Sequence, residues 1–146
     1  MNLLEKLNHI FILKNDLERE HAIGEIGDIF EFGDVEKEEV IEVVNSMLTF
    51  ITQDISDSLK ESILNAINNA LVYKNVGVEI SFDMLIPYLT DLNKAHLSYV
   101  LTFFGFSGDA KYKPLLEKYS ICNDAEIREA AQEALYEIDS RIKKEG

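Results

Sequence analysis

The sequence contains one pair of side chains with a spacing that metal-binding helices use. Glu18 and His21 stand three residues apart, which is the Glu-x-x-His spacing of di-iron helical bundles. Such a centre needs a second copy of the pair and two further inward glutamates. Neither His9 nor His96 follows a glutamate at that spacing, so we interpret His21 as a surface or half-buried histidine and predict no metal site.

Other residues with catalytic side chains lack the motifs that would put them to use. Cys122 and His96 are the types of a thiol nucleophile and its base, but no flanking motif supports the pairing. We expect Cys122 to pack in a turn between helices. Gly24, Gly27 and Gly33 lie in a segment of helical pattern with no lysine at the phosphate-loop position. We therefore predict no catalytic residue, no cofactor and no enzymatic activity.

The net charge limits the kinds of partner that the chain can bind. The 146 residues carry a formal net charge of −13 at pH 7. Proteins that bind nucleic acids or anionic membranes instead neutralise phosphates with clustered lysines and arginines. We therefore predict no direct binding to nucleic acid and no association with membranes.

Length and the first residues favour a single cytoplasmic domain. A chain of 146 residues has the size of one domain and buries roughly 70% of its unfolded surface. The single cysteine excludes an intrachain disulfide and fits a reducing compartment. Residues 1–5 lack a basic segment, and the apolar run from His9 to Leu13 is too short for a signal or a membrane span. We predict one domain over residues 1–146, with the oligomeric state left open.

Acidic residues are concentrated in one segment. The segment from Asn15 to Leu59 contains thirteen acidic residues and two basic residues, so it carries eleven of the thirteen excess negative charges. Such a focused field would steer and hold a basic protein, while a solvated acidic surface remains the alternative interpretation. The predicted partner-binding residues are Asp28, Glu31, Asp34, Glu36, Glu38, Glu39 and Glu42.

Apolar periodicity predicts eight helices that would hold these side chains. Their expected starts are near Asn2, Asn15, Asp34, Ser56, Ser81, Asn93, Asp109 and Asp124. In the third helix the predicted inward stripe is Val40, Ile41, Val44, Met47, Leu48 and Ile51. At 100° per residue, Glu36, Glu38, Glu39 and Glu42 then point the opposite way. We expect residues 76–82 to form an extended connector and Pro87 to kink the fifth helix.

The last third of the chain contains an internal repeat. Val100, Leu101, Phe104 and Gly105 recur after 34 residues as Ala134, Leu135, Ile138 and Asp139, a period typical of helical-hairpin arrays. The run from Val100 to Asp109 resembles the A-L-x-x-L-G-x-x-G-D that ends a helix in HEAT-like repeats, and Asp124 to Leu135 resembles D-x-x-V-R-x-A-A-x-x-A-L. The resemblance implies an all-α fold of about eight helices, arranged as a right-handed α-solenoid of stacked antiparallel hairpins.

Size, predicted architecture and charge together resemble the immunity proteins of bacterial polymorphic toxin and contact-dependent growth inhibition systems. This resemblance implies a stoichiometric inhibitor that binds a cognate toxin domain, commonly a basic nuclease, and occludes its phosphate-binding residues. One alternative is a general HEAT-like adaptor or scaffold protein. A second is a HEAT-like enzyme such as a phycobilin lyase or a DNA glycosylase, which the charge and the lack of a recognisable polar cleft disfavour.

Overall fold

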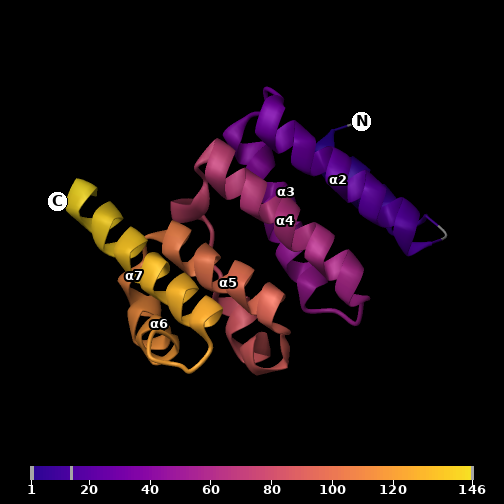
Figure 1. Ribbon diagram of the computed structural model, residues 1–146. Coiled ribbons are helices and arrows are strands. Elements are labelled where there is room, and N and C mark those ends of the chain that lie inside the picture. The colour runs from indigo at the N-terminus through magenta and orange to yellow at the C-terminus, as the bar shows by residue number, and fades with distance from the viewer. Residues whose placement is uncertain (1, 14, 146) are drawn as a thin grey trace. The chain divides into compact units, whose positions relative to one another are not determined.

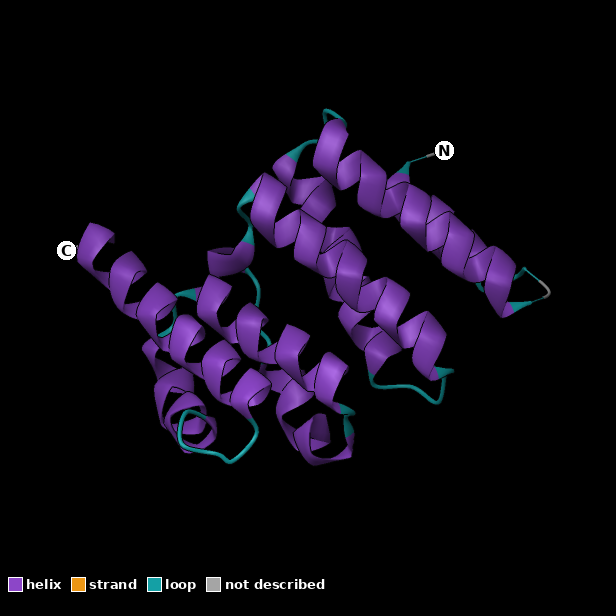
Figure 2. Cartoon of the chain, viewed as in Figure 1, coloured by secondary structure: helices purple, strands orange, loops and turns teal. Residues whose placement is uncertain are grey.

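The computed structural model describes residues 2–13 and 15–145, apart from the side chains of residues 144 and 145, and is helical throughout (Figures 1 and 2). Its α-helices are α1 (Leu3–Ile10), α2 (Asp16–Phe32), α3 (Lys37–Ile51), α4 (Asp57–Lys74), α5 (Lys94–Ser107), α6 (Lys113–Tyr119) and α7 (Ala125–Glu145). Three 3-10 helices complete the set: η1 (Gly77–Glu79), η2 (Asp83–Asp91) and η3 (Ala110–Tyr112). No described residue belongs to a strand. The predicted all-α class is confirmed.

Backbone contacts divide the chain into two compact units. The first spans Met1–Val76 and the second Gly77–Gly146. Unit 1 contains α1 to α4, and unit 2 contains η1, η2, α5, η3, α6 and α7. The single domain over residues 1–146 stays a prediction, and each unit is described by itself.

Short polar side chains begin most helices of unit 1. Asn2 and Asn15 accept hydrogen bonds from the third backbone N–H groups of α1 and α2, each at 2.9 Å. Ser56 does the same for Leu59 of α4 at 3.2 Å. Each cap satisfies a donor that the helix leaves unpaired. At the other end of α4, Asn75 adopts the left-handed conformation with φ 52°.

In unit 1, α2 and α4 pack side by side and run in the same direction (Figure 1). The Ser58 hydroxyl hydrogen-bonds the Glu20 carboxylate near the amino-terminal ends, and the Lys74 ammonium donates to the Gly33 carbonyl near the carboxyl-terminal ends. Between these two contacts the helices pack closely at Gly27, where a Cβ would lie in ordinary van der Waals contact, 3.5 Å from the Ala66 Cα.

Some expectations for unit 1 are wrong. Leu17 has the apolar side chain expected of an inward-facing position, but it is 78% exposed. Asn69 has a polar side chain that would suit the solvent side of α4, but it is half-buried and donates to the Gly27 carbonyl at 3.2 Å. Asp34 does not cap α3: the helix begins after Glu36, which is extended and makes no side-chain capping bond. Residue type alone suggests a cap at Asp34, but it does not determine the residue at which the helix begins.

Unit 2 is built around α5, which packs along α7. Asn93 caps α5 by accepting from His96 N at 2.9 Å. The Asp124 carboxylate accepts from two backbone N–H groups in the first turn of α7. A Cβ on Gly105 would lie 2.9 Å from the Ala134 Cα, so the glycine lets the two backbones touch. Two of the repeated positions therefore meet in the packing of α5 on α7.

The start of unit 2 differs from the prediction. The alternating residues 76–82 contain the 3-10 turn η1 and do not form a fully extended connector. The expected kinked α-helix around Pro87 is instead η2, a 3-10 helix of nine residues. Proline lacks the N–H of an α-helical hydrogen bond, which favours the tighter winding. Leu85 and Leu89 are buried, whereas Met84 and Tyr88 are 41% and 38% exposed.

Candidate protein-binding surface

Three predicted partner-binding carboxylates lie at the amino-terminal end of α3. Glu36, Glu38 and Glu42 are all exposed. Val40 and Val44 of the same helix are fully buried, so the helix separates apolar from acidic side chains as its sequence periodicity predicts. These glutamates present negative charge to solvent beside the first turn of the helix.

Glu39 is oriented differently from its acidic neighbours. Its Oε1 atom accepts a hydrogen bond from the Leu3 backbone N–H at 2.8 Å, and the side chain is half-buried. The expected outward orientation of this glutamate is wrong. The unpaired N–H groups and partial positive charge at the start of α1 attract a carboxylate, so Glu39 holds α1 against α3.

The carboxyl-terminal half of α2 and the residues after it contribute the remaining predicted carboxylates. Asp28 and Asp34 are exposed, whereas Glu31 is half-buried. A hydrogen bond to the Glu31 carboxylate, and the negative charge of that group, raise the pKa of the Tyr73 hydroxyl above its ordinary value. Glu31 and Tyr73 are therefore neighbours near the carboxyl-terminal ends of α2 and α4.

The described ion pairs of unit 1 leave most of this acidic surface exposed. Arg19 contacts Asp16 at 3.3 Å, and His21 contacts Glu25 at 3.4 Å. Both pairs lie within α2 and do not involve the glutamates at the start of α3. We define Asp28, Asp34, Glu36, Glu38 and Glu42 as the acidic surface.

Of the side chains considered for metal or thiol chemistry, His21 belongs to unit 1, whereas His96 and Cys122 belong to unit 2. His21 is 81% exposed and pairs with Glu25, which lies one turn further along α2. Across residues 2–13 and 15–145, no three metal-ligating side chains come together. In unit 2, His96 is buried at 3% exposure, while Cys122 is half-buried in a turn and its Sγ lies 3.5 Å from the Asp124 carbonyl.

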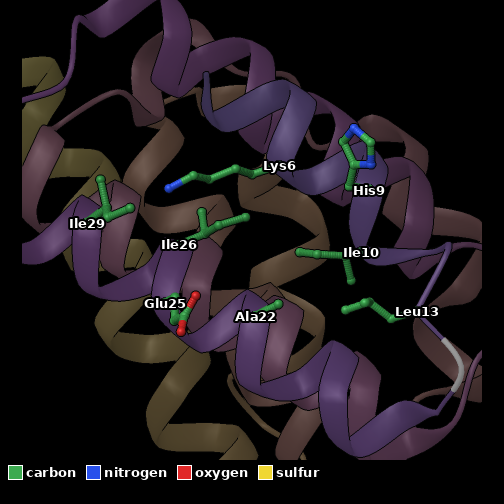
Figure 3. Close-up of a pocket in the computed structure, with 8 residues that line it drawn as sticks. All are labelled: Lys6, His9, Ile10, Leu13, Ala22, Glu25, Ile26 and Ile29. Carbon is green, nitrogen blue, oxygen red and sulfur yellow. The ribbon is translucent and has the colours of Figure 1, made fainter. Parts of the chain in front are cut away.

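A groove between α1 and α2 was not predicted from the sequence. It has a volume of about 280 Å³ and is lined by Lys6, His9, Ile10, Leu13, Ala22, Glu25, Ile26 and Ile29 (Figure 3). Ile10 and Ile26 are buried at its base, whereas Leu13, Ala22 and Ile29 are half-exposed. Apolar periodicity marks Ile10, Ala22 and Ile26 as inward, but it does not reveal that α1 and α2 leave a gap between them.

Charged groups of opposite sign flank the groove. Lys6 and His9 belong to α1, and Glu25 belongs to α2. Figure 3 shows the Lys6 side chain extended towards the end of the groove that holds Ile29, with the Glu25 carboxylate on the α2 side. All three side chains are exposed. The groove thus combines an apolar floor with polar edges, the composition of many binding sites.

Comparisons with known proteins give no relative on which a function could be based. No protein-family model, no curated protein and no solved structure matches the chain. Within the described part of the chain, no helix combines the length and apolar character that crossing a membrane requires.

Proposed function

We propose that the chain is a stoichiometric protein-binding module that binds a basic protein domain through its acidic surface. The observation that carries the proposal is the exposure of Glu36, Glu38 and Glu42 on one end of α3. Carboxylates gathered in one place produce a field that accelerates association with a basic partner and repels nucleic acid.

The specific form that we propose is an immunity protein that neutralises a bacterial toxin domain of the basic nuclease type. Exposed carboxylates would contact the lysines and arginines that such a nuclease uses to bind phosphate. Occupying these residues blocks the substrate without any reaction by the inhibitor. The supporting features are the concentration of negative charge in residues 15–59 and the exposure of Asp28, Asp34, Glu36, Glu38 and Glu42.

We further propose that the helices form a HEAT-like right-handed stack of hairpins. In such arrays every second helix packs in parallel with the one before it. The support comes from each unit separately. In unit 1, α2 lies parallel to α4, and in unit 2 Lys94 contacts Asp124 at 3.2 Å while Gly105 approaches Ala134, which makes α5 and α7 parallel.

The test uses the product of the gene immediately upstream. An immunity protein predicts a large secreted protein there with a variable C-terminal domain. That domain is purified and titrated with the chain by isothermal titration calorimetry, and its nuclease activity on plasmid DNA is measured in parallel. We expect a stoichiometric complex and complete inhibition. A complex that leaves the nuclease active would instead support the adaptor function, and catalysis by the isolated chain would contradict both.

A further inference from the structure

We propose that the groove between α1 and α2 is a docking site for an amphipathic helix of the basic partner, which inserts two apolar side chains one turn apart. This inference rests on the proposed function and names the contact that supplies its affinity. Exposed charges mainly set association rate and specificity, whereas affinity comes from a few apolar or aromatic anchors buried in pockets. The groove is a concave apolar site of unit 1 that could receive them.

The volume of the groove fits two anchors. An engineered apolar cavity of about 150 Å³ is known to hold one benzene molecule. The groove measures about 280 Å³, so it has room for two side chains of that size. One large aromatic residue would leave part of the apolar floor uncovered.

The length of the groove fits a helix. Its α2 side extends from Ala22 to Ile29, which at 1.5 Å per residue is about 10 Å. Two side chains one turn apart on a docked helix are separated by about 5 Å along its axis, so both fit within this length. Beyond Ile29, the Phe32 side chain is 81% exposed three residues further along α2.

Charge selects a basic helix as the occupant. Glu25 lies on the α2 edge of the groove. Asp28 lies three residues further along the helix, so the two side chains are neighbours on its surface. Lysines or arginines on the flank of the docked helix that faces α2 would contact both carboxylates. Lys6 and His9 on α1 favour a polar or acidic residue on the other flank, so the two edges fix the orientation of the helix. The same carboxylates disfavour an anionic lipid.

The first measurement locates binding in the wild-type protein. The probe is a fluorescein-labelled amphipathic peptide of about 15 residues, long enough to become helical, with two leucines four positions apart and lysines on one flank. Anisotropy gives the affinity, and methyl NMR follows Ile10, Ile26 and Ile29. We expect binding that shifts these three methyl groups. A peptide with alanines in place of the leucines should bind about tenfold more weakly or worse, because it lacks the anchors.

The second measurement closes the groove. Ala22 is half-buried in its wall, so Ala22→Phe should fill it and weaken peptide binding about tenfold or more by excluding an anchor. Leu17→Phe is the matched control, since Leu17 lies on the same helix at 78% exposure and does not line the groove. If Ala22→Phe does not fold, the methyl shifts of the wild-type protein decide the question.

Several results would overturn the inference: no binding of the leucine peptide, equal binding of the alanine peptide, full affinity in Ala22→Phe, or methyl shifts with a medium-chain fatty acid but not with the peptide. These failures are distinct from failure of the proposed function. If the upstream toxin domain binds Ala22→Phe as tightly as wild type, the groove inference alone is wrong. If the peptide docks in the groove but no toxin domain binds, the immunity function alone is wrong.

Discussion

The Glu39 carboxylate accepts a hydrogen bond from the backbone N–H of Leu3 at 2.8 Å, which ties the first turn of α1 to α3. Thirty-six residues separate the two groups in the sequence. The contact therefore fixes one wall of the groove between α1 and α2, and it removes one carboxylate from the set available to a partner.

The first prediction concerns this contact. Glu39→Ala should lower the free energy of unfolding by about 1 to 2 kcal/mol, because it removes a charged acceptor from a helix amino terminus. The change should appear in urea denaturation followed by circular dichroism. Glu38→Ala is the matched control. Glu38 directly precedes Glu39 and is exposed, so its loss should change stability by less than about 0.5 kcal/mol. Equal effects of the two variants would contradict the structural role of Glu39.

The second prediction concerns the contact between α5 and α7. Gly105→Ala should destabilise the protein by about 1 to 3 kcal/mol, because the new Cβ would lie too close to the Ala134 backbone. Gly24→Ala on α2 is the control: a Cβ at that position would meet no described neighbour within 4 Å, and removing a helix-interior glycine should stabilise by about 0.5 to 1 kcal/mol. Thermal denaturation of both variants tests the opposite signs.

The third prediction compares two leucines of the internal repeat. Leu101 is completely buried, whereas Leu135 is half-buried. Leu101→Ala should therefore cost about 2 to 5 kcal/mol, and Leu135→Ala should cost less, since it removes less buried apolar surface. Chemical denaturation that ranked Leu135→Ala as the more damaging change would contradict the assigned packing of α5 and α7.

Several helix starts and the exposure of acidic side chains could be predicted from the sequence. Asn15, Ser56 and Asn93 were predicted as helix starts and are helix caps, because capping is a local property of a short polar side chain followed by a helical pattern. Exposure of Glu36 and Glu38 also followed from local periodicity. The same local pattern failed at Asp34, because the helix begins three residues later.

Features that depend on distant parts of the chain were missed. The hydrogen bond of Glu39 depends on where α1 lies relative to α3. The groove depends on the gap between Ile10 of α1 and Ile26 of α2. Leu17 has an apolar side chain at the start of α2, yet no described helix covers it. Sequence spacing describes one helix at a time, so it gave no information about these contacts.

The fourth prediction follows from the hydrogen bonds around Asp83. Tyr112 donates to its carboxylate at 2.7 Å and Lys111 at 3.2 Å, and these contacts hold the pKa of Asp83 below its ordinary value. A lowered pKa in the folded state contributes stability that is present above about pH 4 and is lost as the pH falls below it. Asp83→Asn should therefore flatten the decline in stability below about pH 4.

Stability between neutral and acidic pH, measured by urea denaturation at each pH, tests the Asp83 prediction. Asp91→Asn at the other end of η2 provides a control, because this exposed carboxylate lies outside the Tyr112 and Lys111 contacts. A profile for Asp83→Asn that runs parallel to wild type throughout the acidic range would show that the Tyr112 contact adds no pH-dependent stability.

The fifth prediction joins the acidic surface to the proposed function. Lysine at Glu36, Glu38 and Glu42 should leave the fold intact, because all three side chains are exposed, but should reverse the local field. Association with a basic toxin domain should slow by about tenfold or more at low salt. The difference from wild type should shrink as salt is added, since ions screen charges separated by more than about 10 Å. Glu39 is left unchanged in this variant because it caps α1.

The control for this charge reversal places lysine at Glu117, Glu129 and Glu133, which are exposed in unit 2. It changes the net charge by the same amount, so a slow rate confined to the α3 variant would locate the binding field at the start of α3. Surface plasmon resonance at several salt concentrations gives the rates, and circular dichroism verifies the helical content. Equal slowing in both variants would mean that only total charge matters, and an unchanged rate in both would leave the α3 glutamates as a solvated surface.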